Sequence, residues 1–329
     1  MEPEISAVEV RPPTPTASLT PRTSERKRFS GWAGPKTAVG RQQERLGWLL
    51  VLPSLIVVFA VAIYPLFETF RLSFTNARLA SAREVRNVGW ENYRTLLEDD
   101  TWWTAMRNTL VFTVSSVTLE AILGMIVALT IHSQFRGRGL VRTSMLVPWA
   151  IPTVVSSLLW QWMLNDRYGV INSIFIRLGF MESDRNFAWI ANPSTALGAA
   201  VAIDVWKTTP FMALLLLAGL QIIPGDVYEA SYVDGASKWQ QFWQITLPLV
   251  KPALLVALIF RTMDSFRVFD LIYVLKAGAT ETITVAIYTQ QVLIQSSRIG
   301  AGSAAAVVIF VCIGIMVFGY SRLITVEEN

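Results

Sequence analysis

The stretch PGDVYEASYVDGASKWQQFWQITLP, residues 224–248, lies between two long apolar segments, yet it has the pattern of folded protein. Asp226 can cap one short helix and Ser237 a second, because both residue types accept hydrogen bonds from the first amides of a helix. Gly235 supplies the break between them, since glycine enters left-handed conformations without strain. The segment therefore predicts two small helices at an angle, with aromatic side chains such as Trp239 on the outside, available to another protein.

The chain on both sides of this loop is organised as membrane spans. It has 329 residues, of which 53% are hydrophobic and only 16% charged, too apolar a composition for a soluble globular domain. A backbone in lipid must satisfy its own hydrogen bonds, so long windows almost free of charge predict helices. We expect one all-α integral membrane protein with six spans at about 46–74, 105–131, 142–164, 195–221, 249–273 and 299–322.

Charge predicts the orientation. Residues 1–45 are rich in Pro, Ser, Thr and Arg, which predicts a disordered basic tail. The positive-inside rule places this tail in the cytoplasm, and six spans return the C-terminus and the loop at 224–248 to the same side. The expected organisation is a tail at 1–45, a multi-pass domain at 46–323 in the cell membrane, and a short cytoplasmic tail at 324–329.

Several function classes are disfavoured. Cys312 and His132 are the only cysteine and the only histidine, so neither an intrachain disulfide nor a His-based metal or catalytic cluster can form. There is no G-x-x-x-x-G-K-[ST] loop to cradle ATP phosphates, so we expect no bound cofactor and no enzyme activity. The net charge of +4 reflects topology and does not point to nucleic acid. A proton-coupled secondary carrier stays possible because of Asp204, Asp264 and Asp270.

Two polar faces lie within the fourth and fifth spans. The fourth span carries, at i, i+3, i+4 and i+7, the residues Asp204, Lys207, Thr208 and Phe211. The fifth span repeats this spacing with Arg261, Asp264, Ser265 and Val268. Such spacing puts each set on one side of its helix. An ionisable group inside a span costs about 2.5–3.5 kcal/mol, so both faces must contact protein or water.

These faces have two interpretations. In the first, ion pairs lock the bundle, joining Asp204 with Lys207, and Asp264 with Arg261 or Arg267. In the second, the faces line a polar chamber for a sugar, because charged groups bond to hydroxyls and aromatic rings pack on C–H surfaces. The rings expected there belong to Trp206, Phe211 and Phe266.

The third span contains Pro148 and Pro152 and ends in Trp160-Gln161-Trp162. The last three residues are expected near the outer end of the span. They would either line a cavity or form an aromatic belt at the headgroup level.

The loop at 224–248 resembles the EAA loop of ABC importer permeases. The matching residues are Glu229-Ala230-Ser231, Asp234-Gly235-Ala236, Ile245 and Leu247-Pro248, with Ser231 in place of the second alanine. In that family the loop docks into a cleft on the cytoplasmic ATPase and passes its closing motion to the membrane helices. The resemblance implies coupling roles for Glu229, Ala230, Asp234, Gly235, Ala236, Trp239 and Pro248.

From Val147-Pro148 onward, the chain resembles the larger permease subunit of maltose/trehalose-type ABC importers, and residues 205–211 and 261–264 are most similar to trehalose permeases. The resemblance implies the six-helix type I importer fold, and sugar binding on the two polar faces. It also implies a second homologous permease, two ATPase copies that bind ATP and Mg, and an extracellular or periplasmic sugar-binding protein. The expected activity is disaccharide import by alternating access; another polyol or oligosaccharide is the alternative within the family.

Overall fold

The computed structural model describes residues 38–79, 84–133, 135–182 and 187–325, and the described chain is almost entirely helical. Among the described residues, five helices are long and apolar enough to cross a membrane, and a bent pair makes a sixth when it is counted as one span, which confirms the predicted fold class. The spans are Glu44–Leu72, Asp100–His132, Arg138–Ala150 with Thr153–Met163, Pro193–Leu220, Lys238–Lys276 and Ile299–Arg322.

The chain divides into two units, Met1–Val61 and Ala62–Asn329. The described helices are α1 (Ala38–Val58), α2 (Tyr64–Leu72), α3 (Glu91–Leu97), α4 (Asp100–His132), α5 (Arg138–Met145), α6 (Val147–Ala150), α7 (Thr153–Met163), α8 (Val170–Arg177), α9 (Pro193–Leu220), α10 (Gly225–Val233), α11 (Lys238–Gln241), α12 (Leu247–Ser265), α13 (Asp270–Lys276), α14 (Val285–Gln290) and α15 (Ile299–Thr325). Short turns join some of them: the π-helical η1 (Phe59–Ile63), η2 (Phe242–Thr246) and η4 (Gln291–Gln295), and the 3₁₀ turn η3 (Thr280–Thr282).

Helices α1 and α15 extend into the two segments predicted as tails. Helix α1 begins at Ala38, inside the segment 1–45 predicted to be disordered, because Gln, Glu and Arg before the apolar run are good helix formers. Helix α15 continues to Thr325, past the boundary predicted at 323. Residues 1–37 and 326–329, on which the remaining tail predictions fall, lie outside the described residues.

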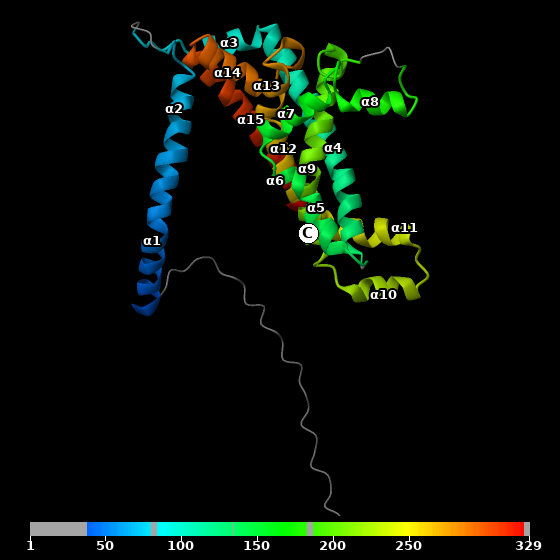
Figure 1. The fold of residues 1–329 in the computed structure, drawn as a ribbon. Coiled ribbons are helices and arrows are strands. Elements are labelled where there is room, and N and C mark those ends of the chain that lie inside the picture. The colour runs from blue at the N-terminus through cyan, green and yellow to red at the C-terminus, as the bar shows by residue number, and fades with distance from the viewer. Residues whose placement is uncertain (1–37, 80–83, 134, 183–186, 326–329) are drawn as a thin grey trace, which may run out of the picture. The chain divides into compact units, whose positions relative to one another are not determined.

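Helices α4, α9 and α12 pack against one another and form the centre of the second unit (Figure 1). Two apolar clusters fill the space between them. One lies toward the end that carries α13 and includes Phe112 and Ile203; the other lies toward the end that carries α10 and includes Ile131 and Leu216. Gly124 permits the close approach of α4 to α9, since a Cβ there would lie 2.6 Å from the Cγ atom of Met212.

The third span is broken, which the expectation of one helix over 142–164 did not include. Helix α6 ends at Ala150 and helix α7 begins at Thr153, and the segment Arg138–Ala150 is bent by 92° from the segment Thr153–Met163. Ile151 and Pro152 between them are extended, with ψ of 133° and 141°. Proline has no N–H to donate and keeps the preceding residue out of helical geometry, so the sequence Ile151-Pro152 ends one helix and begins another.

Candidate functional site

A cluster of charged side chains lies between the two apolar clusters, where α4, α9 and α12 meet. Arg261 on α12 is only 2% exposed and forms its centre. Glu120 on α4 is fully buried, and Asp204 on α9 is 9% exposed. Glu120 is not among the residues predicted for the site, although a lone carboxylate in the middle of an apolar span is itself a signal, because such groups persist there only with a partner.

Arg261 holds this cluster together. Its Nε and Nη2 atoms donate to the two carboxylate oxygens of Glu120 at 2.5 and 2.8 Å, a bidentate arrangement. Its Nη2 also donates to Asp204 at 3.1 Å, and its Nη1 donates to Asp264 at 2.5 Å. One guanidinium therefore contacts three carboxylates from three helices. We call these four residues, Arg261, Glu120, Asp204 and Asp264, the Arg261 cluster.

The ion-pair interpretation is correct for Asp264 and wrong for Asp204. Asp264 pairs with Arg261, which is one of its two predicted partners. Asp204 also pairs with Arg261, and not with Lys207, its predicted partner. The Lys207 ammonium group donates to the carbonyl oxygens of Ile151 at 2.9 Å and Trp149 at 3.5 Å. These carbonyls lie at the break of the third span, where the end of α6 leaves acceptors without helical partners.

Two cavities lie beside the Arg261 cluster. The aspartate cavity, of about 310 Å³, is lined by Trp149, Thr153, Asp204, Lys207, Thr208, Asp264, Ser265, Arg267, Val268, Phe269, Asp270 and Leu271. The aromatic cavity, of about 360 Å³, is lined by Trp149, Thr208, Phe211, Phe260, Arg261, Met263, Asp264 and Arg267. Every one of the eight residues predicted to bind sugar lines one cavity or both. The structure thus brings the two predicted faces together.

The side chains around these cavities divide into buried and accessible groups. The Asp264 side chain is 72% exposed and lines both cavities, although Arg261 beside it is buried. Trp149 and Phe211 stack at 5.9 Å between ring centroids, with an interplanar angle of 16°, on the wall of the aromatic cavity. Accessible carboxylate, hydroxyl and flat aromatic groups occur here side by side, a combination that suits a polyhydroxylated molecule.

Two predicted aromatic contributors do not line either cavity. Phe266 is 1% exposed and belongs to the apolar cluster near α13. Trp206 packs edge-on against Trp160, with 5.4 Å between ring centroids. Both lie on apolar sides of their helices, and helix phase is hard to assign from sequence when a span is apolar on most sides.

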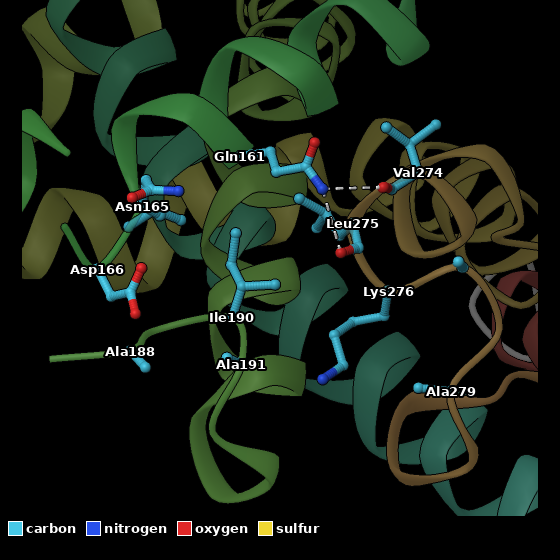
Figure 2. A pocket seen from close by; sticks show the side chains of 12 residues that line it. Gln161, Asn165, Asp166, Ala188, Ile190, Ala191, Val274, Leu275, Lys276 and Ala279 are labelled. Atoms are coloured by element: carbon cyan, nitrogen blue, oxygen red, sulfur yellow. Dashed lines mark hydrogen bonds between the residues drawn. The ribbon is translucent and has the colours of Figure 1, made fainter. Parts of the chain in front are cut away.

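A third cavity, of about 410 Å³, lies toward the α13 end of the bundle (Figure 2). Gln161 lines it and donates from Nε2 to the carbonyl oxygens of Val274 at 3.3 Å and Leu275 at 3.4 Å, which links α7 to α13 (Figure 2). Trp162, by contrast, is 60% exposed. Of the two interpretations of Trp160-Gln161-Trp162, cavity lining therefore applies to Gln161.

Helices α10 and α11 form the predicted pair of short helices at the opposite end (Figure 1). Ser237 accepts from the Gln240 amide in a capping box, and Gly235 has φ of +79°, both as predicted. Asp226 is not the N-cap: α10 begins at Gly225 after Pro224, so Asp226 lies in the first turn. The helix therefore starts two residues earlier than predicted, directly after Pro224 at the N-cap position.

The predicted coupling residues lie mainly on the surface of this loop. Exposed are Glu229, Ala230, Asp234, Gly235, Trp239 and Pro248, whereas Ala236 is half-buried. Trp239 is 70% exposed and packs on Trp243, which is 51% exposed. An aromatic patch of this kind on a protruding loop is typical of a protein-binding surface.

Two hydrogen bonds fasten α10 to the start of the fifth span. The Gln241 side chain donates from Nε2 to Ser231 Oγ at 3.0 Å, and the hydroxyls of Tyr228 and Thr246 lie 3.0 Å apart. Ser231 is 8% exposed, so the hydroxyl that replaces the second alanine of the motif has a buried partner. Helix η2 leads directly into α12, the helix that carries Arg261 and Asp264.

Comparison with known proteins gives a consistent result. Residues 120–325 match the family described as binding-protein-dependent transport system inner membrane component. The trehalose transport system permease protein SugA of Mycobacterium tuberculosis is 39% identical over 301 residues, which cover 92% of this chain and 95% of that protein. The trehalose/maltose transport system permease protein MalF of Thermococcus litoralis is 43% identical over 276 residues, 83% of this chain and 91% of that protein.

A further relative and a solved structure extend the comparison. The sulfoquinovosyl glycerol transport system permease protein SmoG of Agrobacterium fabrum is 36% identical over 285 residues, 86% of this chain and 91% of that protein. A chain in the crystal structure of a bacterial alginate ABC transporter superposes with a TM-score of 0.74 at 23% identity, covering 86% of this chain and 94% of that chain. The solved structure shows a shared fold. The chain therefore belongs to the family of binding-protein-dependent transport system inner membrane components, as a transporter subunit and not an enzyme.

Proposed function

We propose that this chain is a permease subunit of an ATP-driven importer that carries a neutral disaccharide of the trehalose or maltose type. The observation that carries the proposal is the position of Asp264, an accessible carboxylate that lines both cavities in the middle of the bundle. Carboxylates accept hydrogen bonds from sugar hydroxyls, and the stacked Trp149 and Phe211 offer flat apolar faces for the rings. The names of two relatives, which transport trehalose or trehalose and maltose, agree with this cargo.

The charges around the cavity favour a neutral sugar over an anionic one. The aspartate cavity is lined by three carboxylates, Asp204, Asp264 and Asp270, and by two cations, Lys207 and Arg267. Lys207 donates to backbone carbonyls at the break of the third span, so part of its donor capacity is already used. An anionic cargo would meet like charges in a site partly shielded from water, where repulsion is strong.

Transport would proceed by alternating access with partner subunits. A sugar-binding protein outside the cell delivers the sugar to this chain and a second homologous permease. Two ATPase copies, which bind ATP and Mg, close on the cytoplasmic side, where both termini of this chain also lie. The exposed face of α10 and α11, with Glu229 and Trp239, docks on the ATPase, and η2 transmits the movement to α12.

Asp264→Asn in the complete complex tests the site. The complex should still assemble, because Arg261 keeps Glu120 and Asp204 as partners. Loss of the charge should raise the trehalose or maltose concentration that gives half-maximal uptake into vesicles about tenfold, since a hydrogen bond to a charged group contributes about 1.5–3 kcal/mol. Asp226→Asn, an exposed carboxylate in the loop, is the matched control and should leave uptake unchanged.

Two results would contradict the proposal. Wild-type uptake of both sugars by Asp264→Asn would remove this cavity from the transport path. Full uptake without nucleotide would favour the proton-coupled carrier. A panel of polyols and oligosaccharides, assayed for stimulation of ATP hydrolysis, separates a disaccharide importer from one with another neutral cargo.

A further inference from the structure

Glu120 is placed unlike any other acidic residue of the Arg261 cluster. It is the only ionisable residue in the long apolar part of α4 between Phe112 and Ile131. It is fully buried, and it lines neither the aspartate cavity nor the aromatic cavity. A group in this position cannot contact the cargo directly. Its effect on a cargo must pass through the residues that it contacts.

Glu120 contacts both polar faces at once. It binds Arg261 of α12 through two donor atoms, Nε and Nη2, which fixes the plane of the guanidinium group. It also accepts from the hydroxyl of Thr208 on α9 at 2.5 Å. Arg261 in turn donates from Nη1 to Asp264, and Thr208 and Asp264 both line the two cavities. Glu120 therefore contacts Thr208 directly and Asp264 through Arg261, and both of these residues line the two cavities.

Charge neutralisation alone does not explain Glu120. Asp204 and Asp264 already supply two carboxylates for the single guanidinium of Arg261. A third buried carboxylate adds negative charge and a desolvation cost that further hydrogen bonds must offset. Beyond its charge, Glu120 fixes the orientation of its partners. Of the three carboxylates in the cluster, only Glu120 accepts from two atoms of Arg261 and also from the Thr208 hydroxyl.

We infer that Glu120 is a positioning residue for cargo affinity: it orients Arg261 and Thr208 so that Asp264 and the Thr208 hydroxyl face the cargo in the correct arrangement. This inference rests on the proposed cargo site. It assigns to a residue outside both cavities a role in how tightly the sugar is held. Glu120 acts in this way through side chains on α9 and α12.

Glu120→Gln in the complete complex gives the first test. Glutamine keeps the shape but loses the charge and replaces one acceptor oxygen with a donor. The concentration of trehalose or maltose for half-maximal uptake should rise about tenfold, whereas the maximal rate for each assembled complex should change less than about twofold. A merely structural residue would instead lower the amount of complex and leave the half-maximal concentration as it was.

Two further variants make this test specific. Thr113→Val is the matched control, because Thr113 is a buried residue of the same helix whose hydroxyl has no hydrogen-bond partner in the described part of the chain. It should leave both uptake parameters unchanged. Glu120→Asp keeps the charge on a shorter side chain and should recover part of the affinity. If Glu120→Gln fails to assemble, Glu120→Asp becomes the deciding variant, and wild-type affinity in its assembled complexes overturns the inference.

A double-mutant cycle with Asp264→Asn distinguishes this inference from the proposed function. If Glu120 acts through Arg261 on Asp264, then adding Glu120→Gln to Asp264→Asn should raise the half-maximal concentration less than about twofold further. Full additivity of the two effects overturns the part of the inference that runs through Arg261 to Asp264. An effect of Asp264→Asn without any effect of Glu120→Gln overturns the inference alone, whereas the absence of an effect of Asp264→Asn overturns the proposed cargo site.

Discussion

The α10–α11 loop and the Arg261 cluster differ in how far apart along the chain their contacting residues lie and in how exposed these residues are. The loop is one continuous stretch whose hydrogen bonds join residues no more than 18 positions apart, and its motif residues are mainly exposed. In the cluster, Arg261 contacts Asp204, 57 positions earlier in the chain, and Glu120, 141 positions earlier, and Arg261 itself is buried. A surface loop of this kind needs a partner to act, whereas a buried cluster is satisfied within the chain. Substitutions should therefore affect stability strongly in the cluster and weakly in the loop, and the predictions follow in that order.

The largest effect is expected from Arg261→Met. This change removes the one cation from among Glu120, Asp204 and Asp264 and leaves three carboxylates close together. Breaking a buried ion pair by removing one partner costs about 3–5 kcal/mol, so little folded complex should be recovered from membranes. Recovery and thermal unfolding of the solubilised complex are the measurements. Arg267→Met, whose guanidinium bonds only a backbone carbonyl among the described residues, is the control and should assemble normally.

If Arg261→Met is recovered in the wild-type amount and unfolds at the wild-type temperature, the expected difference in sensitivity between the cluster and the loop is contradicted. It would mean that the buried carboxylates become protonated or hydrated without a cost in free energy. Substitutions in the cluster would then affect stability no more than substitutions on the surface.

Lys207→Met should give the next largest effect. The ammonium group satisfies the carbonyls of Ile151 and Trp149 at the break of the third span, and methionine cannot donate to them. These carbonyls are partly buried, so leaving them unpaired should cost about 1 kcal/mol, which should appear as a lower unfolding temperature of the assembled complex. Arg142→Met, an exposed cation of the same broken span, should lie within about 0.5 kcal/mol of wild type. Equal unfolding temperatures for both variants would show that Lys207 does not support the break.

Ser231→Ala tests the interior of the loop. It restores the alanine of the motif but leaves the amide of Gln241, which is 4% exposed, without its hydroxyl partner. The expected loss is at most about 1 kcal/mol, because both groups are neutral. Thermal unfolding measures it, and Ser237→Gly, which replaces one favourable capping residue with another, is the control at the N-cap of α11. If Ser231→Ala unfolds above wild type, the hydrogen bond contributes nothing.

The contrast between the regions also explains what sequence analysis could predict. The six spans follow from apolar windows, and the loop follows from residues adjacent in the chain, such as Gly235 and Ser237. The two polar faces follow from helical spacing, and the structure places all eight of their predicted residues on the two cavities. These features depend on local pattern, which is visible without knowing how the helices pack.

The missed features depend on packing between helices. Glu120 has both its partners on α9 and α12, so nothing next to it in the chain indicates its role. The pairing of Asp204 with Arg261, and not with Lys207 one turn away, depends on how α9 faces α12. Likewise, Lys207 bonds to carbonyls that become available only because the helix breaks at Pro152.

Glu229→Lys should have the smallest effect on stability and a large effect on function, which makes it the sharpest test of the contrast. Glu229 is exposed, so its substitution should leave the unfolding temperature within about 0.5 kcal/mol of wild type. If the loop docks on the ATPase, the reversed charge should uncouple ATP hydrolysis from uptake in an intact complex. Asp226→Lys, an exposed carboxylate of α10 outside the motif, should retain coupling. Normal uptake by Glu229→Lys would contradict docking through this residue, and failure to assemble would show that the loop, like the cluster, contributes to the stability of the fold.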